Sequence, residues 1–196
     1  MFYKFRSLDN LQFVMDIIVN QRLYAATLDT MNDPMEGFYT HESDIPDEAI
    51  IALEEHKKSL KFSSLSMYDN NPLMWAHYAN GCRGAAIGIE FKDGVDFRNV
   101  TYGTHSELSL NKPTTLERAK QVLSYKSDFW HYEDEVRAFA DKGSYIPVIV
   151  KEVVLGQRAD RSQKALLKKI VNAVNPAIKI QEWDEEKLYV HSQPVK

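Results

Sequence analysis

The stretch GAAIGIEF (residues 84–91) is almost continuously apolar and contains two glycines, Gly84 and Gly88. Such a run is typical of a strand that is buried on both faces, and a glycine within it allows another backbone to approach closely. We therefore expect a strand that is buried on both sides or closely approached by another backbone, and the rest of the chain is interpreted outward from it.

Apolar periodicity predicts further strands and helices on both sides of this stretch. Strands are predicted at residues 2–6, 22–27, 60–66, 97–103, 130–139 and 145–156, with a terminal hairpin at 177–183 and 187–192. Helices are predicted at residues 10–20, 46–58, 71–81, 114–129 and 161–174. We expect Ser7 or Asp9 to cap the first helix and Asn71 to cap the third. Together these elements predict one α+β domain over residues 1–196, with a central mixed or antiparallel sheet and flanking helices.

Composition limits the class of protein. The 196 residues suffice for one domain, and a 44% apolar fraction can supply a core. A net charge of −4 gives no general electrostatic footprint for nucleic acid. Only one cysteine is present, and neither a signal peptide nor an apolar span of membrane length is visible. These features predict a cytoplasmic protein with no membrane association.

The stretch WHYEDEVRAF (residues 130–139) places Glu133, Glu135 and Arg137 at alternate positions. On a strand these side chains project from one face, and two carboxylates about 6–7 Å apart raise the pKa of one of them. That arrangement suits acid–base chemistry or stabilisation of a cation. The alternative is an exposed strand face on which Arg137 neutralises both acids.

The stretch NDPMEG (residues 32–37) predicts a rigid turn, because asparagine and aspartate bond to their own backbone, proline fixes φ and glycine permits a positive φ. Asn32, Asp33 and Glu36 could hold a polar ligand. The alternative is ordinary turn chemistry with a solvated Glu36.

The stretch MWAHYANGCRG (residues 74–84) contains aromatic side chains beside His77 and Cys82. His77 is a candidate site residue, whereas a thiol–imidazole pair with Cys82 is disfavoured because no third orienting group is evident. The sequence contains no metal-ligand spacing. A basic helix at residues 157–169 could face phosphates, or could be a solvated surface.

As a set, YKFRS, LYAATLDTMNDPMEG, FSSLS, MWAHYANGCRGAAIGIEF, KSDFWHYEDEVR and VVLG resemble the bacterial domain-of-unknown-function family 2971, from Tyr3 to about Gly156. This chain has Cys82 where that family often has a histidine. The resemblance implies a bacterial or phage-related protein acting in microbial conflict or phage defence.

The order of Arg6, the serines of FSSLS and the Glu133–Glu135 pair also resembles ADP-ribosyltransferases of the R-S-E type. That resemblance implies two facing sheets and NAD as substrate. Glu135 would be the key catalytic carboxylate, and Glu133 would address an acceptor, protein or nucleic acid, of unknown identity. The resemblance also implies a set of NAD-binding residues, with Arg6 on the phosphates: Tyr3, Arg6, Asn32, Asp33, Ser66, Trp75 and His77.

Two hypotheses of different classes follow. The first is an NAD-cleaving transferase, which predicts that Arg6, Asn32, Asp33, His77 and Glu135 converge on one cleft. The second is a non-catalytic module that binds a nucleotide or a protein, in which Glu133, Glu135 and Arg137 form a closed ladder of ion pairs. Under the second hypothesis, mutation of these residues costs stability rather than turnover.

Overall fold

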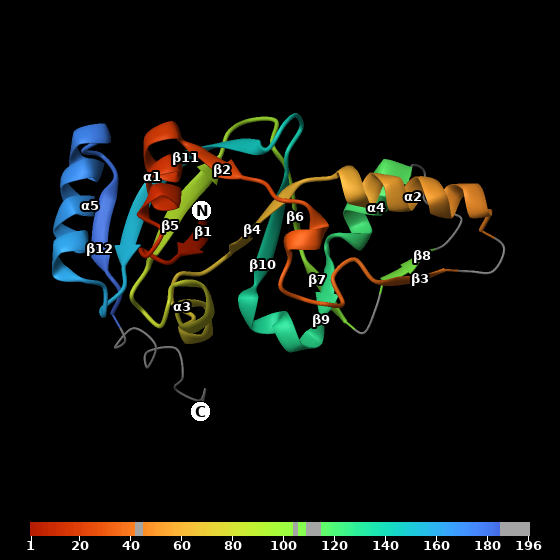
Figure 1. The fold of residues 1–196 in the computed structure, drawn as a ribbon, viewed down its shortest axis with the longest axis horizontal. Helices are drawn as coiled ribbons and strands as arrows, with labels where there is room; N and C mark the ends of the chain where they lie inside the picture. Colours follow the sequence, from red (N-terminus) through yellow and green to blue (C-terminus); the bar gives the residue numbers. More distant parts are fainter. Residues whose placement is uncertain (42–44, 104–105, 109–114, 185–196) are drawn as a thin grey trace, which may run out of the picture. The chain divides into compact units, whose positions relative to one another are not determined.

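The computed structural model describes residues 1–41, 45–103, 106–108 and 115–184 (Figure 1). It has an α+β fold with a mostly antiparallel sheet and flanking helices, as predicted. The chain divides into two compact units. Unit 1 comprises residues 1–23, 65–94 and 147–196, and unit 2 comprises residues 24–64 and 95–146. The prediction of a single domain is not tested by this division and stays a prediction.

Unit 1 is built around β5 (Ala85–Phe91), of which the first five residues are buried. It pairs antiparallel with β1 (Phe2–Arg6) on one side and β11 (Tyr145–Leu155) on the other. A Cβ added at Gly84 would lie 2.2 Å from the Arg6 carbonyl oxygen, which confirms the expected close approach of two backbones. Strand β12 (Lys179–Glu182) pairs parallel to β11, and β2 (Arg22–Tyr24) also pairs with β11.

Three helices belong to unit 1: α1 (Leu11–Asn20), α3 (Pro72–Tyr78) and α5 (Arg161–Val174). Their buried side chains and those of the strands form its core, which includes Phe5, Val14, Ile18, Trp75, Ile87, Ile89, Val153, Leu167 and Val171.

Unit 2 contains the beginning of β4 (Phe62–Ser66), which is followed in the sheet order by β10 (Glu135–Phe139) and β6 (Asp96–Asn99). Two short parallel pairs accompany them: β7 (Thr101–Gly103) with β9 (Tyr125–Ser127), and β3 (Tyr39–His41) with β8 (Ser106–Leu108). The helices are α2 (Asp47–Ser59) and α4 (Thr115–Val122), with short 3₁₀ turns η1 (Leu28–Thr30) and η2 (Asp128–Glu133). One buried cluster forms the core: Ile45, Leu53, Leu60, Phe62, Ala119, Val122, Leu123 and Phe139.

Several predicted boundaries were wrong. The helix expected over residues 114–129 ends at Val122, because residues 125–127 pair with β7 instead. The strand expected from residue 130 begins at Glu135, because residues 128–133 form a 3₁₀ turn. Of the terminal hairpin, residues 187–192 lie outside the described residues, and β12 pairs with β11.

The predicted helix caps had mixed outcomes. Asn71 caps α3 by accepting a hydrogen bond from the Leu73 amide at 2.9 Å, as expected. The residue at the N-cap of α1 is Asn10, which makes no capping bond, so the expectation of a Ser7 or Asp9 cap was wrong. Ser7 and Asp9 bond to each other instead, at 2.9 Å.

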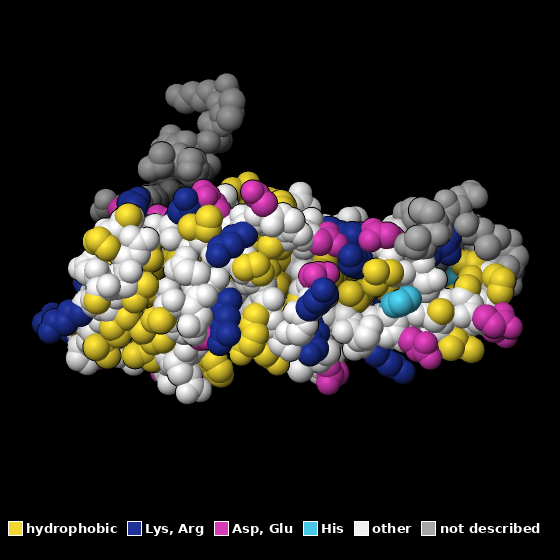
Figure 2. All heavy atoms as spheres, turned by 90° about the horizontal axis from the view of Figure 1, so that it is seen from above, with side chains coloured by type: hydrophobic (Ala, Val, Ile, Leu, Met, Phe, Trp, Pro, Cys, Tyr) yellow, Lys and Arg dark blue, Asp and Glu magenta, His cyan; other side chains and the backbone are white. Residues whose placement is uncertain are grey.

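Charges on the face drawn in Figure 2 are interspersed, with basic and acidic side chains among apolar ones. On the predicted basic helix, now α5, Lys164 and Lys168 both pair with Glu182, which neutralises part of its charge. No helix within the described ranges is long and apolar enough to cross a bilayer.

Candidate functional site

A turn at Asp134 joins η2 to β10 and sets the position of the two predicted catalytic carboxylates. Asp134 has φ of 42°, in the left-handed region that aspartate tolerates better than most residues. Glu133 therefore ends the 3₁₀ turn and Glu135 begins the strand, so the two do not alternate on one strand as predicted. Both are only 3% exposed, which rules out the exposed strand face considered as an alternative.

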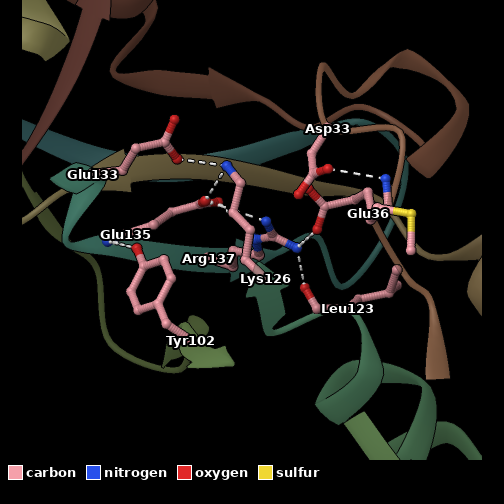
Figure 3. Close-up of polar contacts among 9 residues, drawn as sticks. Asp33, Glu36, Tyr102, Leu123, Lys126, Glu133, Glu135 and Arg137 are labelled. Carbon is pink, nitrogen blue, oxygen red and sulfur yellow. Dashed lines mark hydrogen bonds and ion pairs between the residues drawn. The ribbon is translucent and has the colours of Figure 1, made fainter. Parts of the chain in front are cut away.

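Lys126 brings the two carboxylates together (Figure 3). Its Nζ donates to Glu133 Oε2 at 2.5 Å and to Glu135 Oε2 at 3.1 Å. The ammonium also lies 4.7 Å from the ring centre of Trp130, a favourable cation–π position. Lys126 was not predicted as a site residue, because the sequence pattern placed it inside a helix.

Arg137 continues the network on the other side of Glu135. Its Nε donates to Glu135 Oε1 at 2.6 Å, and its Nη2 donates to Oε2 at 3.2 Å. Nη1 donates to Glu36 and to the backbone carbonyl of Leu123. The guanidinium lies 4.9 Å from the ring centre of Phe62 and is 0% exposed as a residue. Arg137 is thus the structural partner of Glu135, as predicted. The ladder differs from the one expected under the second hypothesis, because Glu133 joins it through Lys126 and Glu36 is a further member.

Further bonds hold the start of β10. The Glu135 amide donates to the Tyr102 hydroxyl at 2.8 Å, and the Ser64 hydroxyl bonds to the Glu135 carboxylate. The predicted serine-rich strand and the Glu135 strand therefore meet within unit 2. Both carboxylate oxygens of Glu135 are already engaged by cations.

The charges of this network shift the pKa values of its members. Burial opposes ionisation of Glu135, but Arg137 and Lys126 outweigh burial and hold its pKa far below the usual range. Burial acts to lower the pKa of Lys126, but the charges of Glu135 and Glu133 outweigh burial, so this pKa is raised. Glu135 is thus ionised at neutral pH and paired with two cations, unlike an acid tuned to exchange protons near neutral pH.

The NDPMEG turn supplies the last carboxylate. Asp33 Oδ1 accepts from the Met35 amide at 2.9 Å, the Glu36 amide donates to the Asp33 carbonyl at 3.0 Å, and Gly37 has φ of 70°. The predicted rigid turn is confirmed by these bonds. Glu36 is not solvated, because its side chain is 4% exposed and pairs with Arg137. Asn32 is exposed.

Most of the other predicted ligand-binding residues lie in unit 1 and have structural partners. Tyr3 donates its hydroxyl to Glu152 at 2.6 Å, and Ser66 is buried and accepts from the Tyr68 amide at 3.3 Å. Trp75 is 0% exposed, and its ring packs edge-on against Phe5. It is a core residue, with no free face for a ligand ring. His77 is exposed on α3.

Arg6 differs from these residues. It ends β1 opposite Ala85, and its Nε is buried without a hydrogen-bond partner. Burial lowers its pKa, and no acid in the described ranges forms an ion pair with it. Arg6 as a whole is half-buried. A buried guanidinium nitrogen without a partner is unusual, because desolvating a charged group without pairing it is costly.

The predicted site residues are thus divided between the units: Tyr3, Arg6, Ser66, Trp75 and His77 in unit 1, and Asn32, Asp33, Glu133 and Glu135 in unit 2. Their convergence on one cleft stays a prediction. Among the described residues, no three acidic, histidine or cysteine side chains are grouped so as to hold a metal ion.

No protein-family model, curated protein or solved structure matches the chain. The resemblances to family 2971 and to ADP-ribosyltransferases therefore rest on the sequence motifs alone.

Proposed function

We propose that this protein is a non-catalytic module that binds a phosphate-bearing nucleotide of the NAD type, with Arg6 on the phosphates. The observation that carries the proposal is the buried, unpaired Nε of Arg6. A phosphate supplies the missing negative charge, and guanidinium–phosphate hydrogen bonds are among the strongest in proteins.

The charged network of unit 2 supports a structural role in this module. Its five members are Glu36, Lys126, Glu133, Glu135 and Arg137, which alternate in charge along the chain of contacts. Fully engaged carboxylates hold strands and turns together, and leave no oxygen of Glu135 for a ribose hydroxyl.

The contact between Ser64 and Glu135 favours a second candidate function, NAD-dependent ADP-ribosyl transfer. In that reaction Glu135 would stabilise the oxocarbenium-like sugar as nicotinamide leaves. It would first have to release Lys126 or Arg137, which is why binding without cleavage is the better-supported function. The acceptor, the role in phage defence and the cytoplasmic location stay predictions.

Calorimetric titration tests the binding proposal with three probes: NAD, ADP-ribose and adenosine. We expect NAD and ADP-ribose to bind and adenosine, which lacks phosphate, to bind far more weakly. Arg6→Gln should weaken NAD binding by about 10- to 100-fold, the loss of one charge-assisted contact. The control is Arg83→Gln, a change at an exposed arginine of the same unit. Equal affinity in wild type and a folded Arg6→Gln variant contradicts the proposal.

Free nicotinamide separates the two candidate functions. Wild-type protein incubated with NAD should bind it and release no nicotinamide. Release by wild type, but not by folded Glu135→Gln, would replace the binding module with the transferase.

A further inference from the structure

The turn at residues 32–38 is inverted relative to an ordinary surface turn. Its acidic side chains point inward, with Asp33 6% exposed and the Glu36 side chain 4% exposed. Its apolar side chains point outward, with Met35 50% and Phe38 55% exposed. Buried charge combined with exposed apolar groups is the reverse of the usual distribution, so polar contacts hold this turn closed.

The inner side of the turn faces a cluster with excess negative charge. Arg137 and Glu135 face Glu36 from β10, and Lys126 faces it from β9. Lys57 of α2 reaches the turn at Gly37, but its ammonium pairs with Glu54. With Glu133 and Asp33 included, four buried carboxylates stand against two buried cations, a formal charge of −2 when all are ionised. Such an excess in a desolvated site favours uptake of a proton.

The two carboxylates that share Arg137 are not equivalent. Glu135 receives two bonds from Arg137 and one from Lys126. Glu36 receives one bond from the same guanidinium. Burial raises the pKa of Glu36, and the attraction of Arg137 does not restore it to the usual value. The Glu36 arm is therefore the weaker and more readily protonated one.

Asp33 supplies an independent geometric sign that this cluster lacks a hydrogen-bond donor. Its Oδ2 is buried with no hydrogen-bond donor, although Oδ1 accepts from the Met35 amide. Figure 3 shows the carboxylates of Asp33 and Glu36 both pointing from the turn toward Arg137. An orphaned carboxylate oxygen in a negatively charged cluster is stabilised when one carboxyl of that cluster is neutral.

We propose that the turn of residues 32–38 is a proton-held latch: it closes over Arg137 when Glu36 carries a proton, and it loosens when Glu36 is ionised. Opening the latch releases one of the bonds to Arg137 and turns Glu36 out to solvent. The latch depends on unit 2 alone and is independent of nucleotide binding at Arg6.

Amide hydrogen exchange from about pH 4 to about pH 8 tests the latch, because closure is strongest below the ordinary Glu36 pKa of 4.5 and weakens as pH rises through the raised value. Three amides report closure, since Met35, Glu36 and Phe38 donate within the turn at 2.9, 3.0 and 3.1 Å. After correction for the intrinsic exchange rate, wild-type protection should fall with pH, by up to about tenfold per pH unit for one linked proton. Glu36→Gln, which mimics the neutral acid and retains an oxygen for Arg137, should keep its protection constant.

The matched control is Glu48→Gln, a change at an exposed carboxylate of α2, which should follow the wild type. Asp33→Asn keeps the oxygen that accepts from Met35 and should reduce the pH dependence. Protection in the wild type that is independent of pH, or an equal pH dependence in wild type and Glu36→Gln, overturns the latch.

Discussion

Arg137 has two carboxylates, a backbone carbonyl and an aromatic ring around its guanidinium, and no exposed surface. An ion pair in such a place gains little over a well-packed apolar pair, because desolvation offsets the attraction. Removal of one partner is a different matter, since the remaining charge stays buried and uncompensated. The network is therefore most sensitive at Glu135, which is bonded to both cations.

At this residue we predict that Glu135→Gln lowers the free energy of unfolding by about 3–5 kcal/mol at pH 7, because Arg137 and Lys126 lose their shared counter-charge. Urea unfolding measures the change. The control, Glu90→Gln, removes a carboxylate that is 49% exposed and paired with Lys151, and should change stability by less than about 1 kcal/mol. Equal effects of the two changes would contradict a structural role for Glu135.

The stability difference between wild type and Glu135→Gln is predicted to depend on pH. The pKa of Glu135 is depressed below its ordinary value of 4.5, so its contribution is complete above that pH and is lost as pH falls toward the folded-state pKa. The stability difference between wild type and Glu135→Gln should therefore be constant from pH 5 to pH 7 and shrink below about pH 4.5. If the stability difference between the two proteins instead widens on acidification, the folded protein holds Glu135 in its neutral form.

Among the elements, α5 offers adjacent leucines in opposite environments. Leu167 is 1% exposed in the core of unit 1, whereas Leu166 is 47% exposed. We predict that Leu167→Ala costs about 2–5 kcal/mol through lost burial and a cavity, and Leu166→Ala less than about 1 kcal/mol. Urea denaturation of both variants checks this, and similar losses would mean that α5 packs through another face.

The elements also show how far sequence reasoning reaches. The buried strand β5 was predicted from its nearly continuous apolar run, helix α2 from Pro46 and the order of its charges, and helix α5 from its amphipathic pattern. The short β9 was missed, because its three residues gain their identity from pairing with β7 rather than from local pattern. Because these residues were assigned to a helix, Lys126 was not recognised as a partner of Glu133 and Glu135. Glu36 was recognised as a polar turn residue, but its bond to Arg137 joins positions 101 apart in the chain and has no local signal.

For the whole molecule, chain connectivity decides how the two units unfold. The chain passes between them after residues 23, 64, 94 and 146, and strand β4 contributes residues to both. Neither unit is a continuous stretch that could separate by melting one linker, as ordinary domains do. The single domain predicted over residues 1–196 stays a prediction, which the thermal transition tests.

We therefore predict one cooperative thermal transition for the whole chain, with calorimetric and van't Hoff enthalpies that agree. Differential scanning calorimetry on three proteins tests this: wild type, Leu167→Ala in unit 1 and Glu135→Gln in unit 2. Each substitution should lower the temperature of the same single transition, because destabilising either unit unfolds both. If each variant instead shifts only one of two resolved transitions, the units are separate domains, and the chain folds despite four crossings between them.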